Sequence, residues 1–170
     1  MSLLYPEDFI KKVLIKEMKD IVIKHPYLAF LLICTGIEFL GRCIDKNNQN
    51  WDSKYQKANP PFDNAIKELF PEKYSLLLKK YSLRDQLRNG MVHILSPKSK
   101  IGLTQLKHCK GQKILTRYHP FEQSGKLVFI IEYFYNDFVE ACKKVLRMKF
   151  NSNDKMNKPF LSIPDLKSCN

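Results

Sequence analysis

The chain has 170 residues, of which 44% are hydrophobic and 27% are charged, and its formal net charge is +12. This balance is typical of one soluble domain with a substantial buried core, and it excludes a scaffold so small that it needs disulfide staples. The basic excess favours a polyanionic partner, either nucleic acid or an anionic membrane surface, although a lysine-rich proteome gives the same charge.

The cysteines indicate a reducing compartment. There are five of them, at positions 34, 43, 109, 142 and 169, and they show no paired spacing. An odd number without a framework favours the cytoplasm, and the N-terminus has no basic segment followed by an apolar run that would predict a signal peptide. Cys34 and Cys142 lie in apolar helical patterns and are expected in the core. We therefore expect a cytoplasmic protein without a membrane partner.

The first half of the chain predicts helices. Apolar residues recur at helical spacing over 7–24, and the His-Pro pair at 25 and 26 ends that helix. A second helix over 27–44 is apolar almost all round. Because Glu38 and Arg42 interrupt it, we expect a central buried helix and not a membrane span. A polar loop over 45–61 and short helices over 62–70 and 72–80 follow.

The second half changes its period. Short apolar bursts predict two or three antiparallel strands near 103–108, 113–118 and 126–131. The segment 132–150 predicts an amphipathic helix whose inward residues are Phe134, Phe138, Cys142 and Val145. The fold class is thus mainly α, a helical bundle with a small antiparallel β-sheet before the last helix. We expect residues 1–150 to form one domain, with a strand insertion at about 101–131. We expect 151–170 to form a flexible C-terminal tail, unless the apolar segment 160–163 docks on the domain.

One helix, beginning near Ser82 and ending at the Ser-Pro pair 96–97, carries the candidate chemistry. Ser82 and Asp85 have the spacing of a capping box. A helical wheel predicts a core stripe formed by Leu83, Leu87, Gly90, Met91 and Ile94. The opposite face carries Asp85, Gln86, Asn89 and His93, and Arg88 lies on the flank between the two.

These residue types suit cleavage of an RNA backbone by its own 2′-hydroxyl. Histidine accepts and donates protons near neutral pH, and arginine matches the geometry of phosphate oxygens. Asn89 can orient the imidazole of His93 or hold a phosphate oxygen. A single exposed helix face excludes little water, so a working site predicts a homodimer in which two motif helices meet.

The segment "RNGMVH", residues 88–93, resembles the motif of the HEPN family (higher eukaryotes and prokaryotes nucleotide-binding), in which an arginine, a polar residue, several further residues and a histidine lie on a late helix of a small bundle. The order of elements over about 7–148 is similar too, apart from the strand insertion. An ordinary exposed helix remains the alternative.

The resemblance implies a metal-independent endoribonuclease without a cofactor. Arg88, His93 and Asn89 would be its catalytic residues, and a 2′,3′-cyclic phosphate would end its product. Such proteins act as hydrolases in toxin–antitoxin and other defence systems, with the motif helix at the dimer interface and an antitoxin protein as a further partner. Other members have lost catalysis, so a non-catalytic RNA-binding or protein-interaction module is the alternative function.

Other polar residues have a supporting role in this hypothesis. We expect Glu38, Asp85 and Gln86 to hold the catalytic side chains in place, although Glu38 could equally pair with Arg42 one turn away. An RNA-binding surface is predicted between positions 98 and 117, where acidic residues are absent, and its members are Lys98, Lys100, Lys107, Lys110, Lys113 and Arg117. The alternative for that surface is a solvated edge hairpin. His108, Cys109 and His119 match no common zinc spacing, so no metal is expected.

Overall fold

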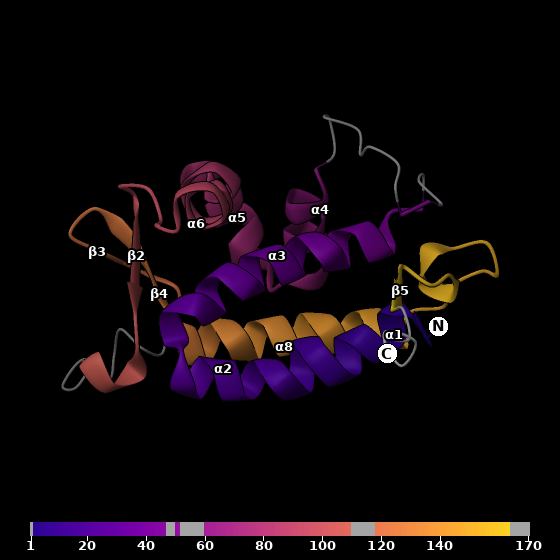
Figure 1. Cartoon of the computed structure of the whole chain (residues 1–170). Coiled ribbons are helices and arrows are strands. Elements are labelled where there is room, and N and C mark those ends of the chain that lie inside the picture. Colours follow the sequence, from indigo (N-terminus) through magenta and orange to yellow (C-terminus); the bar gives the residue numbers. More distant parts are fainter. Residues whose placement is uncertain (1, 47–49, 52–59, 110–117, 164–170) are drawn as a thin grey trace.

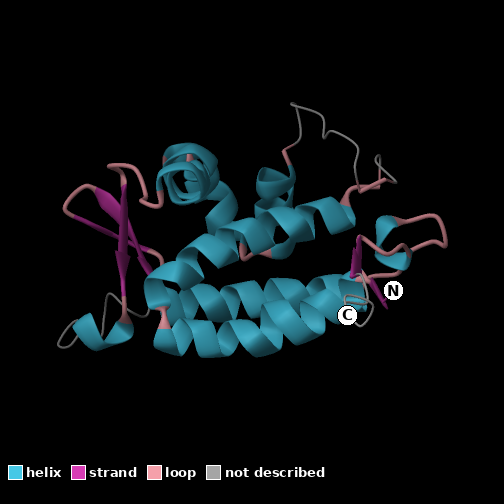
Figure 2. Cartoon of the chain, in the orientation of Figure 1, coloured by secondary structure: helices cyan, strands magenta, loops and turns pink. Residues whose placement is uncertain are grey.

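The computed structural model describes residues 2–46, 50–51, 60–109 and 118–163, and they form a mainly helical domain with a small mixed sheet (Figures 1 and 2). The helical elements are, in chain order, α1 (Pro6–Phe9), the π-helical η1 (Ile10–Glu17), α2 (Met18–Lys24), α3 (Pro26–Ile44), α4 (Pro61–Leu69), α5 (Glu72–Lys80), the π-helical η2 (Arg84–Asn89), α6 (Gly90–Ile94), the 3-10 turn η3 (Leu106–His108), α8 (Ile131–Arg147) and the 3-10 turn η4 (Lys155–Asn157). The strands are β1 (Ser2–Leu4), β2 (Ile101–Thr104), β3 (Phe121–Gln123), β4 (Lys126–Ile130) and β5 (Leu161–Ile163).

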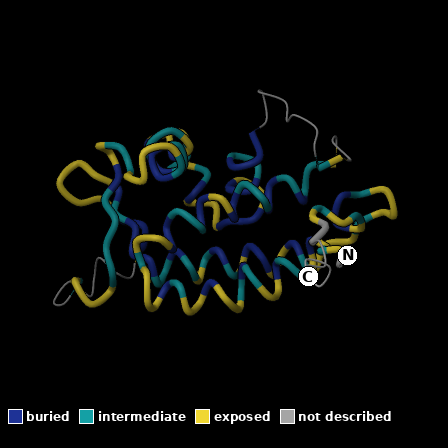
Figure 3. Tube along the Cα trace, in the orientation of Figure 1, coloured by how far each residue is buried: buried dark blue, intermediate teal, exposed yellow. Residues whose placement is uncertain are grey.

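Helix α3 is the centre of the bundle. It runs between α2 and α8 on one side and α4, α5 and α6 on the other (Figure 1). Its side chains Ile33, Cys34 and Ile37 are fully buried. The helix is long and apolar enough to cross a membrane, and half of its most apolar window is buried inside the fold. Figure 3 shows this buried layer between the helices.

The last helix confirms its predicted inward face. Phe134, Phe138, Cys142 and Val145 of α8 are at most 1% exposed. Burial raises the pKa of the Cys34 and Cys142 thiols to about 12, so both stay protonated and behave as small apolar core residues, as expected.

The predicted all-antiparallel sheet is wrong. Strand β4 is central, pairing antiparallel with β3 but parallel with β2. The segment predicted as a strand at 103–108 is strand only to Thr104 and then becomes η3, and most of the one predicted at 113–118 lies outside the described residues. A parallel pair needs a long connection, and the chain between β2 and β4 is long because it includes β3.

The C-terminal segment is also more ordered than predicted. Strand β5 pairs with β1 at the start of the chain, and Lys155 and Met156 are buried. The ring of Phe160 packs against Phe9 and Phe39, with ring centroids 5.2 Å apart in each pair. The structure therefore shows the docking alternative for 160–163 and not a flexible tail over 151–163, because the apolar residues there cover the end of α3 and α1.

A buried histidine lies just before β3. His119 is 4% exposed, its Nδ1 lies 3.8 Å from Asp137 Oδ2, and neither ring nitrogen has a hydrogen-bond partner among the described residues. Tyr74 Oη donates to the same carboxylate at 2.6 Å. Burial, aided by the nearby Lys73 ammonium, lowers the pKa of His119 from its ordinary 6.5 to about 3.

This histidine predicts acid sensitivity. The unfolded chain takes up a proton below pH 6.5 that the folded chain resists down to about pH 3, so the free energy of unfolding should fall as the pH falls through this window. The slope from this group is at most about 1.4 kcal/mol per pH unit. Burial raises the pKa of Asp137, which opposes the loss at the acidic end. Urea unfolding at pH 7, 6 and 5 gives the free energy of unfolding as a function of pH. Its slope should be shallower for His119→Phe than for wild type, and His108→Phe controls for the replacement of a histidine by phenylalanine. Equal slopes for wild type and His119→Phe would contradict the assignment.

Candidate functional site

The motif helix consists of η2 and α6. Its apolar face and one glycine hold it against the bundle. Leu83, Leu87 and Met91 are at most 1% exposed, as the predicted stripe requires. At Gly90, an added Cβ would lie 2.5 Å from the backbone oxygen of Ser96, so only glycine lets the following loop fold back against the helix. Ile94, predicted in the core, is 64% exposed, at the residue where α6 ends.

The first part of this helix is a π-helix, which sequence periodicity did not predict. In a π-helix, hydrogen bonds join residues five apart, so Arg84 and Asn89 lie over one another and Arg88 lies beside them. All three line one pocket. Arg84 was missed as a site residue, although its position four residues before Arg88 on the same helix was a usable signal.

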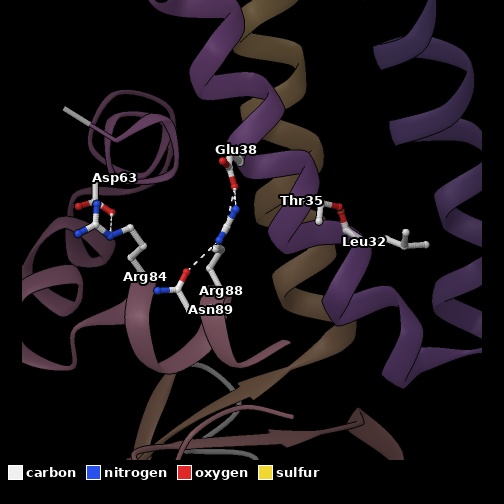
Figure 4. Close-up of polar contacts among 7 residues, drawn as sticks. All are labelled: Leu32, Thr35, Glu38, Asp63, Arg84, Arg88 and Asn89. Carbon is white, nitrogen blue, oxygen red and sulfur yellow. Dashed lines mark hydrogen bonds and ion pairs between the residues drawn. The ribbon is translucent and has the colours of Figure 1, made fainter. Parts of the chain in front are cut away.

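Arg88 is held by two partners (Figure 4). Its Nε donates to Glu38 Oε2 at 2.8 Å, its Nη2 donates to the same oxygen, and its Nη1 donates to Asn89 Oδ1 at 2.9 Å. The Arg88 and Glu38 side chains are each 20% exposed. Glu38 therefore carries its charge into the apolar helix α3 by pairing with Arg88. Arg42, the alternative partner considered for Glu38, donates to the backbone oxygen of Trp51.

The pocket beside Arg88 has a volume of about 330 Å³ and is lined by Glu38, Pro60, Pro61, Phe62, Arg84, Arg88 and Asn89. The Nε of Arg84 lies 3.8 Å from Asp63 Oδ1, and Asp63 lies on the side of Arg84 that is turned away from Arg88. Burial raises the pKa of Asp63, and the Arg84 guanidinium partly offsets this. Of the five N–H donors of Arg88, three are used by Glu38 and Asn89, which leaves two for an anion in the pocket.

His93 lies away from this pocket. It belongs to α6, its side chain is exposed, and it is not among the residues that line the pocket. Helix α6 ends directly after it, since Leu95 adopts a left-handed conformation with φ of 54°. Within one chain, the structure thus joins Arg88 and Asn89 but leaves His93 facing solvent.

Asp85 and Gln86 bind the loop after the helix, and Asp85 also has a side-chain hydrogen bond with Asn89. Among the described residues, neither has a hydrogen bond to Arg88 or His93. Asp85 Oδ1 accepts from Lys98 Nζ at 2.6 Å, which lowers the pKa of that carboxyl, and Gln86 Oε1 accepts from the backbone N–H of Lys100 at 3.3 Å. The predicted capping box is wrong. Ser82 has a positive φ of 51°, and no side chain caps the helix, so Asp85 is free to bind the loop.

The predicted basic surface is only partly described. Lys98 pairs with Asp85, whereas Lys100 and Lys107 are exposed. Lys110, Lys113 and Arg117 lie outside the described residues. Across the ranges that the structure does describe, no three histidine, cysteine or acidic side chains gather as metal ligands.

Comparison with known proteins adds no identification. No protein-family model, no curated protein sequence and no solved structure matches this chain.

Proposed function

We propose that the chain is a metal-independent endoribonuclease of HEPN type. The observation that carries the proposal is the fixed Arg88 guanidinium, held by Glu38 and Asn89 at a pocket that it shares with Arg84. Two arginines beside one open pocket favour a phosphate ligand. A histidine lies five residues after Arg88 on the same helix and supplies the proton-transfer group that phosphodiester cleavage needs.

The proposed reaction needs no cofactor. His93 removes the proton of a ribose 2′-hydroxyl, whose oxygen attacks the adjacent phosphorus. The P–O5′ bond breaks, and an imidazolium protonates the leaving 5′-oxygen, so the products are a 2′,3′-cyclic phosphate and a 5′-hydroxyl. Arg88 donates to the phosphate oxygens, on which negative charge grows in the transition state, and Asn89 keeps the guanidinium in place.

A second copy of the chain completes the site in this proposal. Four exposed apolar residues surround the end of the motif helix, namely Tyr27 (51%), Leu28 (46%), Ile94 (64%) and Leu95 (62%). Tyr27 Oη donates to the backbone oxygen of Leu95 at 2.5 Å, so the two groups form one surface, which we call the Tyr27–Leu95 surface. His93 borders the Tyr27–Leu95 surface. A dimer formed through this surface would therefore bring His93 near the partner chain and exclude water from the imidazole.

A charged residue placed on the Tyr27–Leu95 surface should weaken the dimer. Ile94→Lys should shift the protein from dimer to monomer in sedimentation analysis and should lower cleavage together with dimer content, because a lysine cannot be buried there without a partner. Its fold should persist, since Ile94 is exposed. Leu76→Lys is the matched control, as Leu76 is 71% exposed on α5. A dimer that survives Ile94→Lys would place the interface elsewhere.

The direct test of the function is cleavage of a mixed RNA pool in EDTA. We expect activity that survives chelation and yields cyclic phosphate ends. Activity that disappears with EDTA, or products with 3′-hydroxyl ends, would exclude this mechanism.

The proposed setting is a cytoplasmic toxin or defence effector, restrained by an antitoxin protein. The four cysteines within the described ranges are unpaired, which suits a reducing compartment. This biological role depends on the nuclease activity and fails with it.

The second candidate is a non-catalytic RNA-binding or protein-interaction module. It is favoured by the separation of His93 from the Arg88 pocket within one chain and by the net charge of +12. In that case Lys100→Ala and Lys107→Ala would weaken RNA binding and flatten its salt dependence, whereas His93→Ala would change little.

A further inference from the structure

A second pocket lies on the other side of Glu38. It has a volume of about 370 Å³ and is lined by Thr35, Glu38, Phe39, Arg42, Trp51 and Phe160. Three of its six residues are aromatic and come from α3, from the segment after it and from the C-terminal segment. We call it the aromatic pocket. Glu38 is a common wall of the aromatic pocket and the Arg88 pocket, so the two are adjacent.

The rings of the aromatic pocket are held in place but not covered. Phe39 and Trp51 stack with centroids 5.4 Å apart and an interplanar angle of 7°, and Phe160 lies 5.5 Å from Trp51. Each of the three is only partly buried. Behind them, the buried Lys155 places its Nζ 5.6 Å from the Trp51 ring, a cation–π contact that fixes the indole.

One polar group in this pocket can select a ligand. Glu38 uses Oε2 to hold Arg88, and its Oε1 accepts no hydrogen bond from the described residues. A carboxylate oxygen beside flat aromatic walls suits a flat ligand that carries N–H donors on its edge, as a nucleobase does. Aromatic side chains beside cationic ones are also the usual composition of single-strand binding sites.

We propose that the aromatic pocket binds one base of a single-stranded RNA while the adjoining phosphate binds at Arg84 and Arg88. This inference deepens the proposed function and rests on it for the phosphate half. Bases with an amino group, which donates to Glu38, should bind more tightly than uracil. Glu38 would then position Arg88 with one oxygen and read the base with the other.

Because Trp51 is the single tryptophan of the chain, its fluorescence can report binding at the aromatic pocket. The probe is a 2′-O-methyl hexamer of adenylate, which cannot be cleaved for lack of the attacking hydroxyl, compared with a hexamer of the same backbone without bases. We expect the base-bearing probe to change Trp51 fluorescence and to bind about tenfold more tightly than the abasic one. Phe160→Leu should remove most of this difference.

Phe9→Leu is the matched control, because Phe9 packs against Phe39 and Phe160 but does not line the pocket. It should leave the preference for bases intact. Equal binding of the two probes by wild type, or equal losses in Phe160→Leu and Phe9→Leu, would overturn the inference and leave only a packing cluster.

Arg88→Ala should weaken the binding of both probes by the same factor. Cleavage without a preference for bases would contradict this inference and leave the nuclease proposal standing. Base binding without cleavage would contradict the nuclease proposal and leave this inference standing.

Discussion

His93→Ala is expected to lower RNA cleavage in EDTA by a factor of about 100 to 10,000, the usual contribution of a general acid–base group. The protein should remain folded, because the His93 side chain is exposed and no hydrogen bond in the described part of the chain depends on it. Initial rates on one RNA pool would measure the loss, and circular dichroism would verify the fold. His108→Ala, another exposed histidine, is the matched control. Wild-type cleavage by His93→Ala would exclude His93 as the catalytic group.

Mixing two inactive variants tests whether the site spans two chains. If Arg88 of one chain works with His93 of its partner, a heterodimer of Arg88→Ala and His93→Ala has one intact site and one doubly damaged site. After subunit exchange at equal amounts, cleavage should recover to about a quarter of wild type, because half of the dimers are mixed and each has one working site. No recovery from exchanged dimers would instead place both residues of each site in one chain.

Gly41→Ala is expected to destabilise the fold by about 3 kcal/mol or more, because the new methyl group has no space. Its Cβ would lie 1.8 Å from the backbone oxygen of Pro61, at the start of α4. Backbone at a helix start cannot move without displacing α4. Since Pro60 and Pro61 also line the Arg88 pocket, the surviving folded protein should bind phosphate backbones more weakly.

Gly36→Ala is the comparison within the same helix. There the new Cβ would meet the Phe138 ring, with Cζ 2.6 Å away, and a side chain can shift more easily than backbone. Both replacements gain about 1 kcal/mol of helix propensity, so a difference between them reports the clash. Urea unfolding measures both. Equal stabilities would show that α4 adapts and would contradict the close approach at Gly41.

Local patterns along the chain were sufficient to predict most of the helices and their buried faces. The 3.6-residue period of α8 identified Phe134 and Phe138 as core residues, and the His-Pro pair marked the break before α3. Such features depend on neighbours a few residues apart, so the sequence alone determines them. The same spacing put Arg88, Asn89 and His93 on one helix.

Only the tertiary structure decided how the site is assembled. Glu38 reaches Arg88 from fifty positions away, because α3 crosses the motif helix. The π-helical turn brings Asn89 into the same pocket as Arg84 and Arg88, and the end of α6 leaves Ile94 exposed despite its place in the apolar stripe. Strand β2 pairs parallel with β4, and β5 returns to β1, since these pairings depend on where distant segments meet. Helical period is a local property, whereas pairing partners and exposed ends depend on packing between segments far apart in the chain.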